Sequence, residues 1–430
     1  MDKVLLVSLG CAKNLVDSEL ILGLLKHSDY ELVIDPEKAD LIIINTCGFI
    51  EKSKRESIET ILEYTKYQKK VIVTGCLVER YKEELEKEIP EVDLYIPISE
   101  YKNFTKHLSK IDKNHDYKGI LGLRNDLRVL STPSYSAYLL IGDGCDNRCS
   151  YCAIPLIRGG YRSRQYEELI NEAKDLADRG IKELIVLQQD TTKYGIDLEN
   201  KNIVDLLKGL LEIKEFDYIR LLYLYPDEIS DELIELIGKE ERLTPYFDIP
   251  IQHSETHILE AMNRRGDKEY LRKLFKKIKD RVPNAILRTT LLLGFPGESE
   301  EDVDNLISFI HEVGFDHIGA FTYSKEENTS AYYMDHQIEE EVKKKRLERV
   351  MKEAQKISYR KNKEHIGEIM KGLVVGVEGE YYLLRSYYNA PDDVDGKIYF
   401  TSKNKLELGS LTKVKINETS VYDLYGEEVH

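Results

Sequence analysis

The sequence predicts an α/β protein with three parts: an amino-terminal doubly wound parallel α/β domain over residues 1–130, a partial β/α barrel over 131–362 and a small all-β barrel over 363–430. Apolar, strand-like runs alternate with amphipathic helical segments in two separate series, with an irregular polar stretch over 101–135 between them. Near the carboxyl end, short strands with Gly and Asp turns replace this alternation. At 430 residues the chain is also too long for a single hydrophobic core.

The first series contains three apolar strands and two helices. We expect the strands at 4–11, 39–47 and 70–76, and the helices at 17–28 and 52–68. The first helix begins with Asp and Ser residues, which are favourable N-caps. Long apolar runs without polar alternation are typical of strands covered on both faces, as in a parallel sheet.

Each of these three strands ends in a cysteine. The sequences are SLGC, NTCG and TGC, at Cys11, Cys47 and Cys76. Because the carboxyl ends of parallel strands share one edge of a sheet, with neighbouring strands about 5 Å apart, we expect the three thiols to converge on one site. A glycine adjoins each cysteine, which lets the backbones approach closely: Gly10, Gly48 and Gly75.

The second series predicts six strands with helices between them, the pattern of a partial or full β/α barrel. In such barrels the functional groups lie on loops after the carboxyl ends of the strands. The strand segments are SAYLLIGDGC, KELIVLQQD, YIRLLYLYP, YFDIPIQH, ILRTTLLLGFPGE and HIGAFTYSKE. A highly charged helix over 337–364, expected to be exposed to solvent, then leads to four short strands: KGLVVGVEG, YYLLRSYY, GKIYFTS and LTKVKINETS.

Three of the six cysteines lie within eight residues, in the segment GDGCDNRCSYC after the first barrel strand. Cys145, Cys149 and Cys152 have the spacing Cys-x3-Cys-x2-Cys. Thiolates are soft ligands for zinc or iron–sulfur clusters, and structural zinc normally takes four protein ligands. No further His or Cys occurs between Ala153 and Gln252. Three thiolates on a four-iron cluster would leave one iron open to bind a substrate or cofactor.

Composition and charge indicate a cytoplasmic protein. The chain begins MDKVLLVSLGC, which lacks a signal-peptide cleavage pattern, and no stretch reaches the roughly 18 apolar residues of a membrane span. The formal net charge is −16, which favours a basic partner over nucleic acid. In the reducing cytosol, clustered cysteines are expected to bind metal or do redox work rather than form disulfides.

The three-cysteine loop after the first strand of a β/α barrel resembles the radical S-adenosylmethionine (SAM) superfamily. The resemblance implies a 4Fe-4S cluster whose open iron binds SAM, reductive cleavage of SAM to a 5′-deoxyadenosyl radical, and an electron donor such as flavodoxin or ferredoxin. For Gly294, Gly297 and Glu298, ordinary turn chemistry is the alternative. The residues expected to bind the cofactor are Tyr151, Gln189, Asp190, Gly294, Gly297 and Glu298.

With a second three-cysteine site, the chain resembles the methylthiotransferases, radical-SAM enzymes that insert sulfur into a C–H bond and methylate it. The similarity covers essentially the whole chain and implies a TRAM-type barrel at the carboxyl end. It rests on the segments LGCAKNLVDSE, NTCGFIEKSKRESI, VTGCLVERY, YFDIPIQHSETHILEAMNRRGD, RTTLLLGFPGESEEDV and FTYSKEENTSAY.

Three motifs are similar to the RimO branch, which modifies an aspartate of the twelfth protein of the small ribosomal subunit. They are GCAKNLVDSE, NTCGFI and RSYYNAPDDVDGKIY. The last motif contains Asp392-Asp393-Val394-Asp395, where that branch more often has Glu and Ile. Residues 361–430 carry 9 Lys and Arg against 12 Asp and Glu, so this barrel suits a basic ribosomal protein better than RNA.

The resemblance implies a reaction that uses two 4Fe-4S clusters and two SAM molecules. The barrel cysteines would hold the cluster that cleaves SAM, and the amino-terminal cysteines a second cluster whose open iron carries sulfur. One SAM methylates that sulfur. The radical from the other removes hydrogen from the aspartate β-carbon, which then takes up methylthio. Asp248 and His253, at the end of the fourth barrel strand, either line the substrate site or have a structural role.

Two other functions remain open at this stage. A transfer-RNA adenosine methylthiotransferase, like MiaB, would predict a basic groove and activity on RNA. A non-catalytic iron–sulfur carrier would transfer clusters without cleaving SAM, and the six-strand barrel with its SAM-like motifs argues against it.

Overall fold

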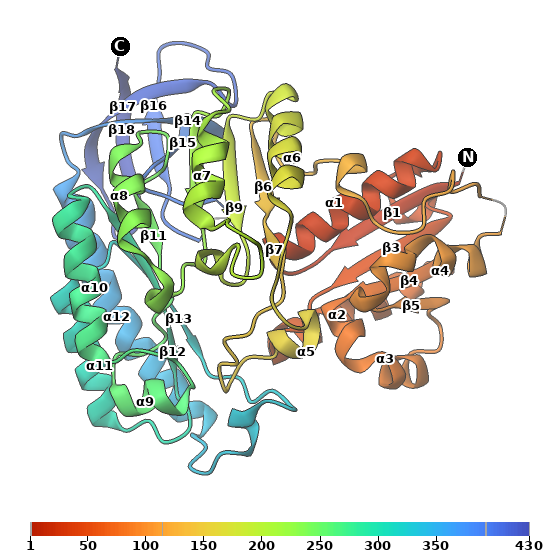
Figure 1. Ribbon diagram of the computed structural model, residues 1–430, viewed down its shortest axis with the longest axis horizontal. Helices are drawn as coiled ribbons and strands as arrows, with labels where there is room; N and C mark the ends of the chain where they lie inside the picture. Colours follow the sequence, from red (N-terminus) through yellow and green to blue (C-terminus); the bar gives the residue numbers. More distant parts are fainter. Residues whose placement is uncertain (1, 114, 392–393, 430) are drawn as a thin grey trace.

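The computed structural model describes residues 2–113, 115–391 and 394–429 (Figure 1). It contains the three expected parts: a parallel α/β domain, a partial β/α barrel and a small closed β-barrel. The fold-class prediction is therefore confirmed, while the domain limits at 130 and 362 stay a prediction. Asp392 and Asp393 of the tail motif lie outside the described residues.

The amino-terminal sheet is parallel throughout and has the strand order β2-β1-β3-β4-β5. The three predicted strands are its centre, and two short edge strands, β2 and β5, were not predicted. Their bounds are β1 Lys3–Ser8, β2 Glu31–Leu32, β3 Leu41–Thr46, β4 Lys70–Gly75 and β5 Leu94–Ile96. The helices of this domain are α1 Ala12–His27, α2 Glu51–Thr65, α3 Cys76–Glu88 and α4 Phe104–Ile111.

Helix α1 begins five residues earlier than predicted, so the expected cap at Asp17 or Ser18 is wrong. Its N-cap is Cys11, which makes no capping hydrogen bond with its side chain. Asp17 lies within the helix and is 5% exposed, because its carboxylate pairs with an arginine of the barrel. A buried ion pair, rather than a helix cap, therefore accounts for this acidic residue.

All six predicted barrel strands are present, as two parallel three-stranded sheets, β6-β9-β10 and β11-β12-β13. A single bridge from Ile219 to Leu243 connects them. Among the described residues no ladder joins β13 to β6, so the barrel is partial rather than full. The strands are β6 Ser136–Leu140, β9 Glu183–Leu187, β10 Tyr218–Leu221, β11 Tyr246–Asp248, β12 Ile286–Leu293 and β13 His317–Thr322.

Helices cover the outer face of these sheets, and a short hairpin closes the neck of the three-cysteine loop. The hairpin pairs β7, Gly142–Asp143, with β8, Arg162–Ser163. The helices after the cysteine loop are α6 Tyr166–Asp178, α7 Ile203–Leu211, α8 Asp231–Lys239, α9 Thr256–Ala261, α10 Lys268–Arg281 and α11 Glu300–Val313. Helix α5, Ile154–Arg158, lies instead within the cysteine loop and contacts α3 of the amino-terminal domain. Single 3-10 turns lie at Pro36–Lys38, Ile98–Asn103, Asn125–Leu127, Thr191–Lys193, Pro226–Glu228 and Ser330–Tyr333.

The charged helix α12, Glu340–Glu364, was predicted in the right place but is not simply a solvated connector. One face packs against the barrel, and Val350 and Ile357 are fully or almost fully buried there. Lys343 and Arg346 on the same helix are also buried, because they bond to the loops after β12 and β13.

The small barrel is closed in the order β14-β15-β16-β18-β17. Four of its strands were predicted and the last was missed: β14 Ile369–Glu378, β15 Tyr381–Ser386, β16 Ile398–Thr401, β17 Leu411–Thr419 and β18 Leu424–Val429. It docks on the amino ends of β6, β9 and β10. Arg385 pairs with Glu183 at 2.6 Å, and Tyr218 donates to the carbonyl of Lys371 at 3.0 Å. The small barrel thus lies at the end of the partial barrel opposite the cysteine loop.

No helix in the described ranges has both the length and the apolar composition needed to cross a lipid bilayer.

Candidate active site

The three amino-terminal cysteines lie at one edge of the sheet, as predicted. Cys11 follows β1, Cys47 follows β3 and Cys76 follows β4, and these three strands are neighbours in the order β1-β3-β4. Cys11 is exposed, whereas Cys47 and Cys76 are each 7% exposed. None of the six cysteines of the chain is in a disulfide. The thiols are therefore gathered and unpaired at the edge where parallel sheets bind ligands.

Glycines bring the three loops into contact. A Cβ on Gly10, whose φ is +92°, would lie 2.8 Å from Cβ of Cys47. A Cβ on Gly48 would lie 2.7 Å from the Leu77 backbone, next to Cys76. Only residues without a side chain fit at these two positions. The predicted close approach of backbones is confirmed at Gly48, whereas Gly10 makes room for the Cys47 side chain.

The barrel cysteines lie on the loop between β7 and α5. The Cys152 amide donates to the Cys149 carbonyl at 3.0 Å, and the Cys145 amide donates to Gly159 at 3.2 Å, so the loop folds back on itself. A buried arginine, Arg264, lies 3.7 Å from the Cys149 sulfur. The Tyr225 hydroxyl lies 3.8 Å from the same sulfur. A positive charge and a hydrogen-bonding group therefore adjoin this thiol.

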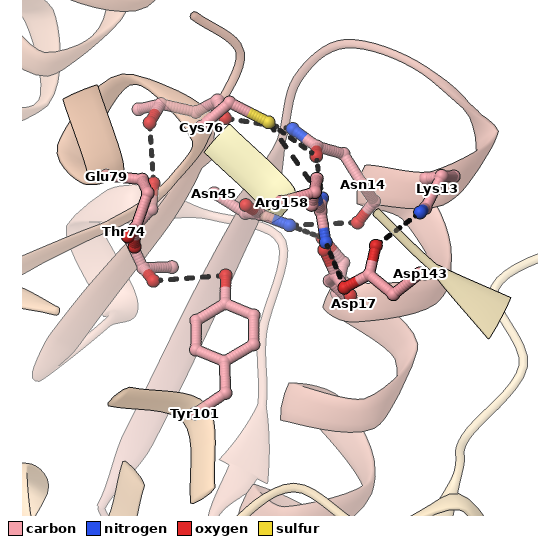
Figure 2. A network of polar contacts seen from close by, with 12 residues as sticks. Lys13, Asn14, Asp17, Asn45, Thr74, Cys76, Glu79, Tyr101, Asp143 and Arg158 are labelled. Carbon is pink, nitrogen blue, oxygen red and sulfur yellow. Dashed lines mark hydrogen bonds and ion pairs between the residues drawn. The ribbon is translucent and has the colours of Figure 1, made fainter. Parts of the chain in front are cut away.

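Two buried cations cross between the domains beside the amino-terminal cysteine site (Figure 2). Lys13, beside Cys11, reaches into the barrel and donates to Asp143 at 2.5 Å and to Gln189 at 2.6 Å. In the opposite direction, Arg158 of α5 donates to Asp17 at 2.6 Å. The side chains of Lys13 and Arg158 are only 6% and 3% exposed. The charge network therefore runs from the amino-terminal site to Asp143, two residues before Cys145.

Arg158 and Asn14 also reach the Cys76 sulfur itself. The guanidinium lies 3.9 Å from Sγ of Cys76, and Sγ donates to Oδ1 of Asn14 at 3.3 Å. The Asn14 amide nitrogen donates to the carbonyls of Leu9 and Thr46, which precede the other two cysteines. Asn14 therefore connects the ends of all three cysteine-bearing strands.

Burial shifts the titration of these groups. It raises the pKa of Cys76 to about 11, opposed by the charge of Arg158, and it raises the pKa of Cys47, Cys145 and Cys152. Burial also opposes ionisation of Asp143, but the charges of Lys13 and Arg158 outweigh it and lower the pKa of that carboxyl. Burial thus disfavours the thiolate form of these four cysteines, and a nearby cation or metal favours it.

Two of the predicted cofactor residues lie beside the cysteine loop. Asp190 is fully buried, and it accepts a hydrogen bond from Asn147 of that loop at 2.7 Å. Burial raises the pKa of its carboxyl. The side-chain oxygen of the neighbouring residue, Gln189, accepts a hydrogen bond from the Lys13 ammonium. These residues follow β9, at the carboxyl end of the barrel, as predicted from the order of the motifs.

The other predicted cofactor residues are Gly294, Gly297 and Glu298, in the loop after β12, and Tyr151, which packs against Phe295 of the same loop. Tyr151 packs edge-on against Phe295, with ring centroids 6.5 Å apart. Glu298 is 3% exposed, and its carboxylate accepts from the Gly294 amide at 2.9 Å and from Arg346 at 2.9 Å. Gly297 has a φ of +84° and open space around it. Turn chemistry therefore accounts for Gly294 and Glu298, and cofactor contact by this group stays a prediction.

Asp248, the last residue of β11, and His253, in the loop that follows, are both buried. Asp248 accepts from Arg288 at 2.8 Å and from the Tyr223 amide at 3.0 Å, which fits the structural alternative. Burial lowers the pKa of His253 to about 3, so its imidazole is neutral at physiological pH. Nε2 of His253 has no hydrogen-bond partner in the described part of the chain, although it lies 3.6 Å from Glu298.

The sequence interpretation missed Lys13, Asn14, Arg158 and Arg264. One signal was available for Arg158: it is the only charged residue in the otherwise apolar segment AIPLIR. Asn14 and Lys13 lie in the motif LGCAKNLVDSE, but their partners lie more than one hundred residues away or on other strands. No local pattern encodes such contacts.

Comparison with known families and proteins agrees with this arrangement. The chain matches the uncharacterized protein family UPF0004 over residues 3–97, the radical SAM superfamily over 139–310 and the TRAM domain over 366–429. A protein of Aquifex aeolicus named ribosomal protein uS12 methylthiotransferase RimO is 47% identical, with 99% of this chain and 97% of the relative covered. A protein of the same name from Acetivibrio thermocellus is 46% identical over 100% of this chain and 98% of its own length.

The chain belongs to the RimO family of methylthiotransferases. It is accordingly a radical-SAM methylthiotransferase, with the TRAM domain as its small barrel. Solved structures support the fold at low sequence identity. The methyltransferase TsrM of Kitasatospora setae aligns with a TM-score of 0.55 at 16% identity over 75% of both chains. The cobalamin-dependent radical enzyme OxsB aligns with a TM-score of 0.53 at 14% identity over 82% of this chain and 56% of OxsB.

Proposed function

We propose that the protein adds a methylthio group to the β-carbon of an aspartate in ribosomal protein uS12, with two 4Fe-4S clusters and two SAM molecules. The observation that carries the proposal is the pair of three-thiol sites, on two domains, joined by one buried charge network. RimO-family relatives named for uS12, at 43–47% identity, support the choice of substrate.

The residues present fit the proposed clusters. Cysteine thiolates are the usual ligands of four-iron clusters, and each site offers three thiols that form no disulfide. In this proposal Cys145, Cys149 and Cys152 hold one cluster, and the amino-terminal cysteines hold the other. When bound, SAM and the clusters supply the methyl group, the hydrogen-abstracting radical and the sulfur that the reaction needs.

The surrounding residues prepare both sites. Arg158 and Arg264 place a positive charge within 4 Å of one sulfur in each site, Cys76 and Cys149. Lys13 holds Gln189, a proposed SAM contact, next to the amino-terminal site.

The charge of the chain favours a protein substrate over RNA. The acidic chain, with a net charge of −16, attracts a basic ribosomal protein and repels RNA phosphates. In this proposal the enzyme works in the cytoplasm and takes electrons from a donor such as flavodoxin or ferredoxin.

The deciding experiment supplies reconstituted enzyme with SAM, a chemical reductant and either uS12 or bulk transfer RNA. Mass spectrometry should find methylthio on the target aspartate of uS12 and none on the RNA. Methylthio on an adenosine would replace the proposal with the MiaB-like alternative. SAM cleavage with neither product would refute both substrates.

A further inference from the structure

One loop of the barrel contacts both cysteine-bearing domains. It spans residues 323–334, after the carboxyl end of β13, and we call it the bridging loop. Its backbone starts at Tyr323, whose amide donates to the Leu293 carbonyl at 2.8 Å, so this end is fixed to the neighbouring strand β12. None of its residues belongs to the charge network of Lys13, Asp143, Arg158 and Asp17.

The first half of the bridging loop holds the amino-terminal domain through Glu326. This carboxylate is 2% exposed and pairs with Arg80 at 2.8 Å and with Lys54 at 3.2 Å. Arg80 extends from α3, and the same guanidinium nitrogen donates to the Gly48 carbonyl at 2.7 Å. Gly48 directly follows Cys47, so the chain of contacts from Glu326 ends at the amino-terminal cysteine site.

The second half of the bridging loop holds the barrel cysteine loop. The Ala331 amide donates to the Ser150 carbonyl at 2.7 Å, and Ser150 lies between Cys149 and Cys152. Ala331 is fully buried, in one apolar cluster with Tyr323 and with Phe295, which packs against Tyr151. This contact therefore ends at the barrel cysteine site.

The segment between these two contacts is short and internally bonded. Both the amide and the hydroxyl of Thr329 donate to the Glu326 carbonyl, at 3.3 and 2.8 Å. The Ser324 hydroxyl donates to the free oxygen of the Glu326 carboxylate at 2.7 Å. Such a segment transmits a displacement at one end to the other instead of absorbing it.

We propose that the bridging loop is a spacer that sets the separation between the two cysteine sites, with Glu326 as its positioning residue. The inference rests on the proposed function, in which sulfur from one site must meet a carbon radical made at the other. A displacement of about 1 Å costs such a step on the order of 100-fold in rate. Glu326 touches neither substrate nor cysteine, so it acts through Arg80 and Gly48.

The test uses Glu326→Gln in the reconstituted full-length enzyme. This substitution keeps the size of the side chain but removes the buried charge that pairs with Arg80 and Lys54. The half-exposed Glu327 then remains as their only carboxylate in the described part of the bridging loop, at 3.6 Å from Arg80 and 3.2 Å from Lys54. We expect unchanged iron content and a rate of 5′-deoxyadenosine release within about twofold of the parent, but roughly 10-fold or more loss of methylthio product per 5′-deoxyadenosine. The magnetic coupling between the two reduced clusters, read by electron paramagnetic resonance, should change as well.

Glu51→Gln is the matched control. Glu51 pairs with the same Lys54 at 3.0 Å, but within α2 and half exposed, so its loss leaves the bridge intact. This variant should make as much methylthio product per 5′-deoxyadenosine as the parent, and its electron paramagnetic resonance spectrum should be unchanged. If Glu326→Gln fails to fold, Arg80→Lys replaces it, because a lysine cannot hold both Gly48 and Glu326. Arg80→Lys is expected to give the results described for Glu326→Gln, and the inference is judged by them in the same way.

The inference is overturned if Glu326→Gln keeps both the product ratio and the magnetic coupling of the parent. It is also overturned if product and 5′-deoxyadenosine fall together with iron content, since that pattern marks general destabilisation. Failure of the proposed function looks different. The parent would then make no methylthio-uS12, while the coupling between its clusters still reports whether Glu326 sets their separation. A parent with a single cluster would overturn the spacer as well.

Discussion

Arg158 is the residue through which the barrel reaches the amino-terminal cysteine site. We expect Arg158→Gln to lower the free energy of unfolding by about 3–5 kcal/mol, because it leaves the Asp17 carboxylate buried without a cation. Arg55→Gln is the control. It removes an arginine that pairs with the Glu51 carboxylate, but this pair is exposed, so its loss should lower the free energy of unfolding by less than about 1 kcal/mol. Urea unfolding measures both, and equal losses would contradict a special role for the buried pair.

Glu298 should give the fold a distinct pH dependence. Burial raises its pKa from the usual 4.5 to about 7, against the opposing Gly294 amide and Arg346. Because the folded state binds this proton more tightly than the unfolded state, Glu298 stabilises the fold fully below about pH 4.5. This contribution to the free energy of unfolding is lost as the pH rises through 7. Glu298→Gln removes the titration, so the stability of the variant relative to the parent should rise by about 3 kcal/mol from pH 4.5 to 8. A difference that stays flat across urea unfolding at these pH values would show that Glu298 is ionised throughout.

At the scale of secondary-structure elements, the sequence predicts what depends on local pattern. The strands β1, β3 and β4 are long apolar runs, so their positions and the cysteines at their ends were predicted correctly. The edge strand β2 has two residues and both are exposed, so it leaves no apolar signal. The start of α1 was missed because Cys11 caps it without a side-chain bond and Asp17 is bonded to another domain.

The turn from β1 to α1 has a steric requirement that can be tested. Gly10→Ala places a Cβ 2.8 Å from Cβ of Cys47 at a φ of +92°. Gly180→Ala has the same backbone conformation, with a φ of +91°, but no atom within 4 Å of the new Cβ. We expect both to lose about 1–2 kcal/mol from backbone strain, and only Gly10→Ala to lose iron from the amino-terminal site. Equal iron content in the two variants would show that the loop can move aside.

At the scale of the whole molecule, the function is divided between domains that local sequence patterns describe separately. Each domain could be assigned from its own motifs, and so could the two sets of cysteines. Their connection could not, because Lys13, Arg158, Arg80 and Glu326 find their partners across a domain boundary. Tertiary packing decides those contacts, and a single sequence carries no periodicity that reports them.

This division of labour predicts that each site can be removed without the other. Reconstituted parent protein should bind about eight iron atoms, the content of two four-iron clusters. Cys149→Ala should retain about four and lose 5′-deoxyadenosine release, because the barrel site no longer holds SAM beside a cluster. Cys76→Ala should also retain about four, yet it should still release 5′-deoxyadenosine and make no methylthio product. About four iron atoms in the parent, or loss of SAM cleavage in Cys76→Ala, would contradict two independent sites.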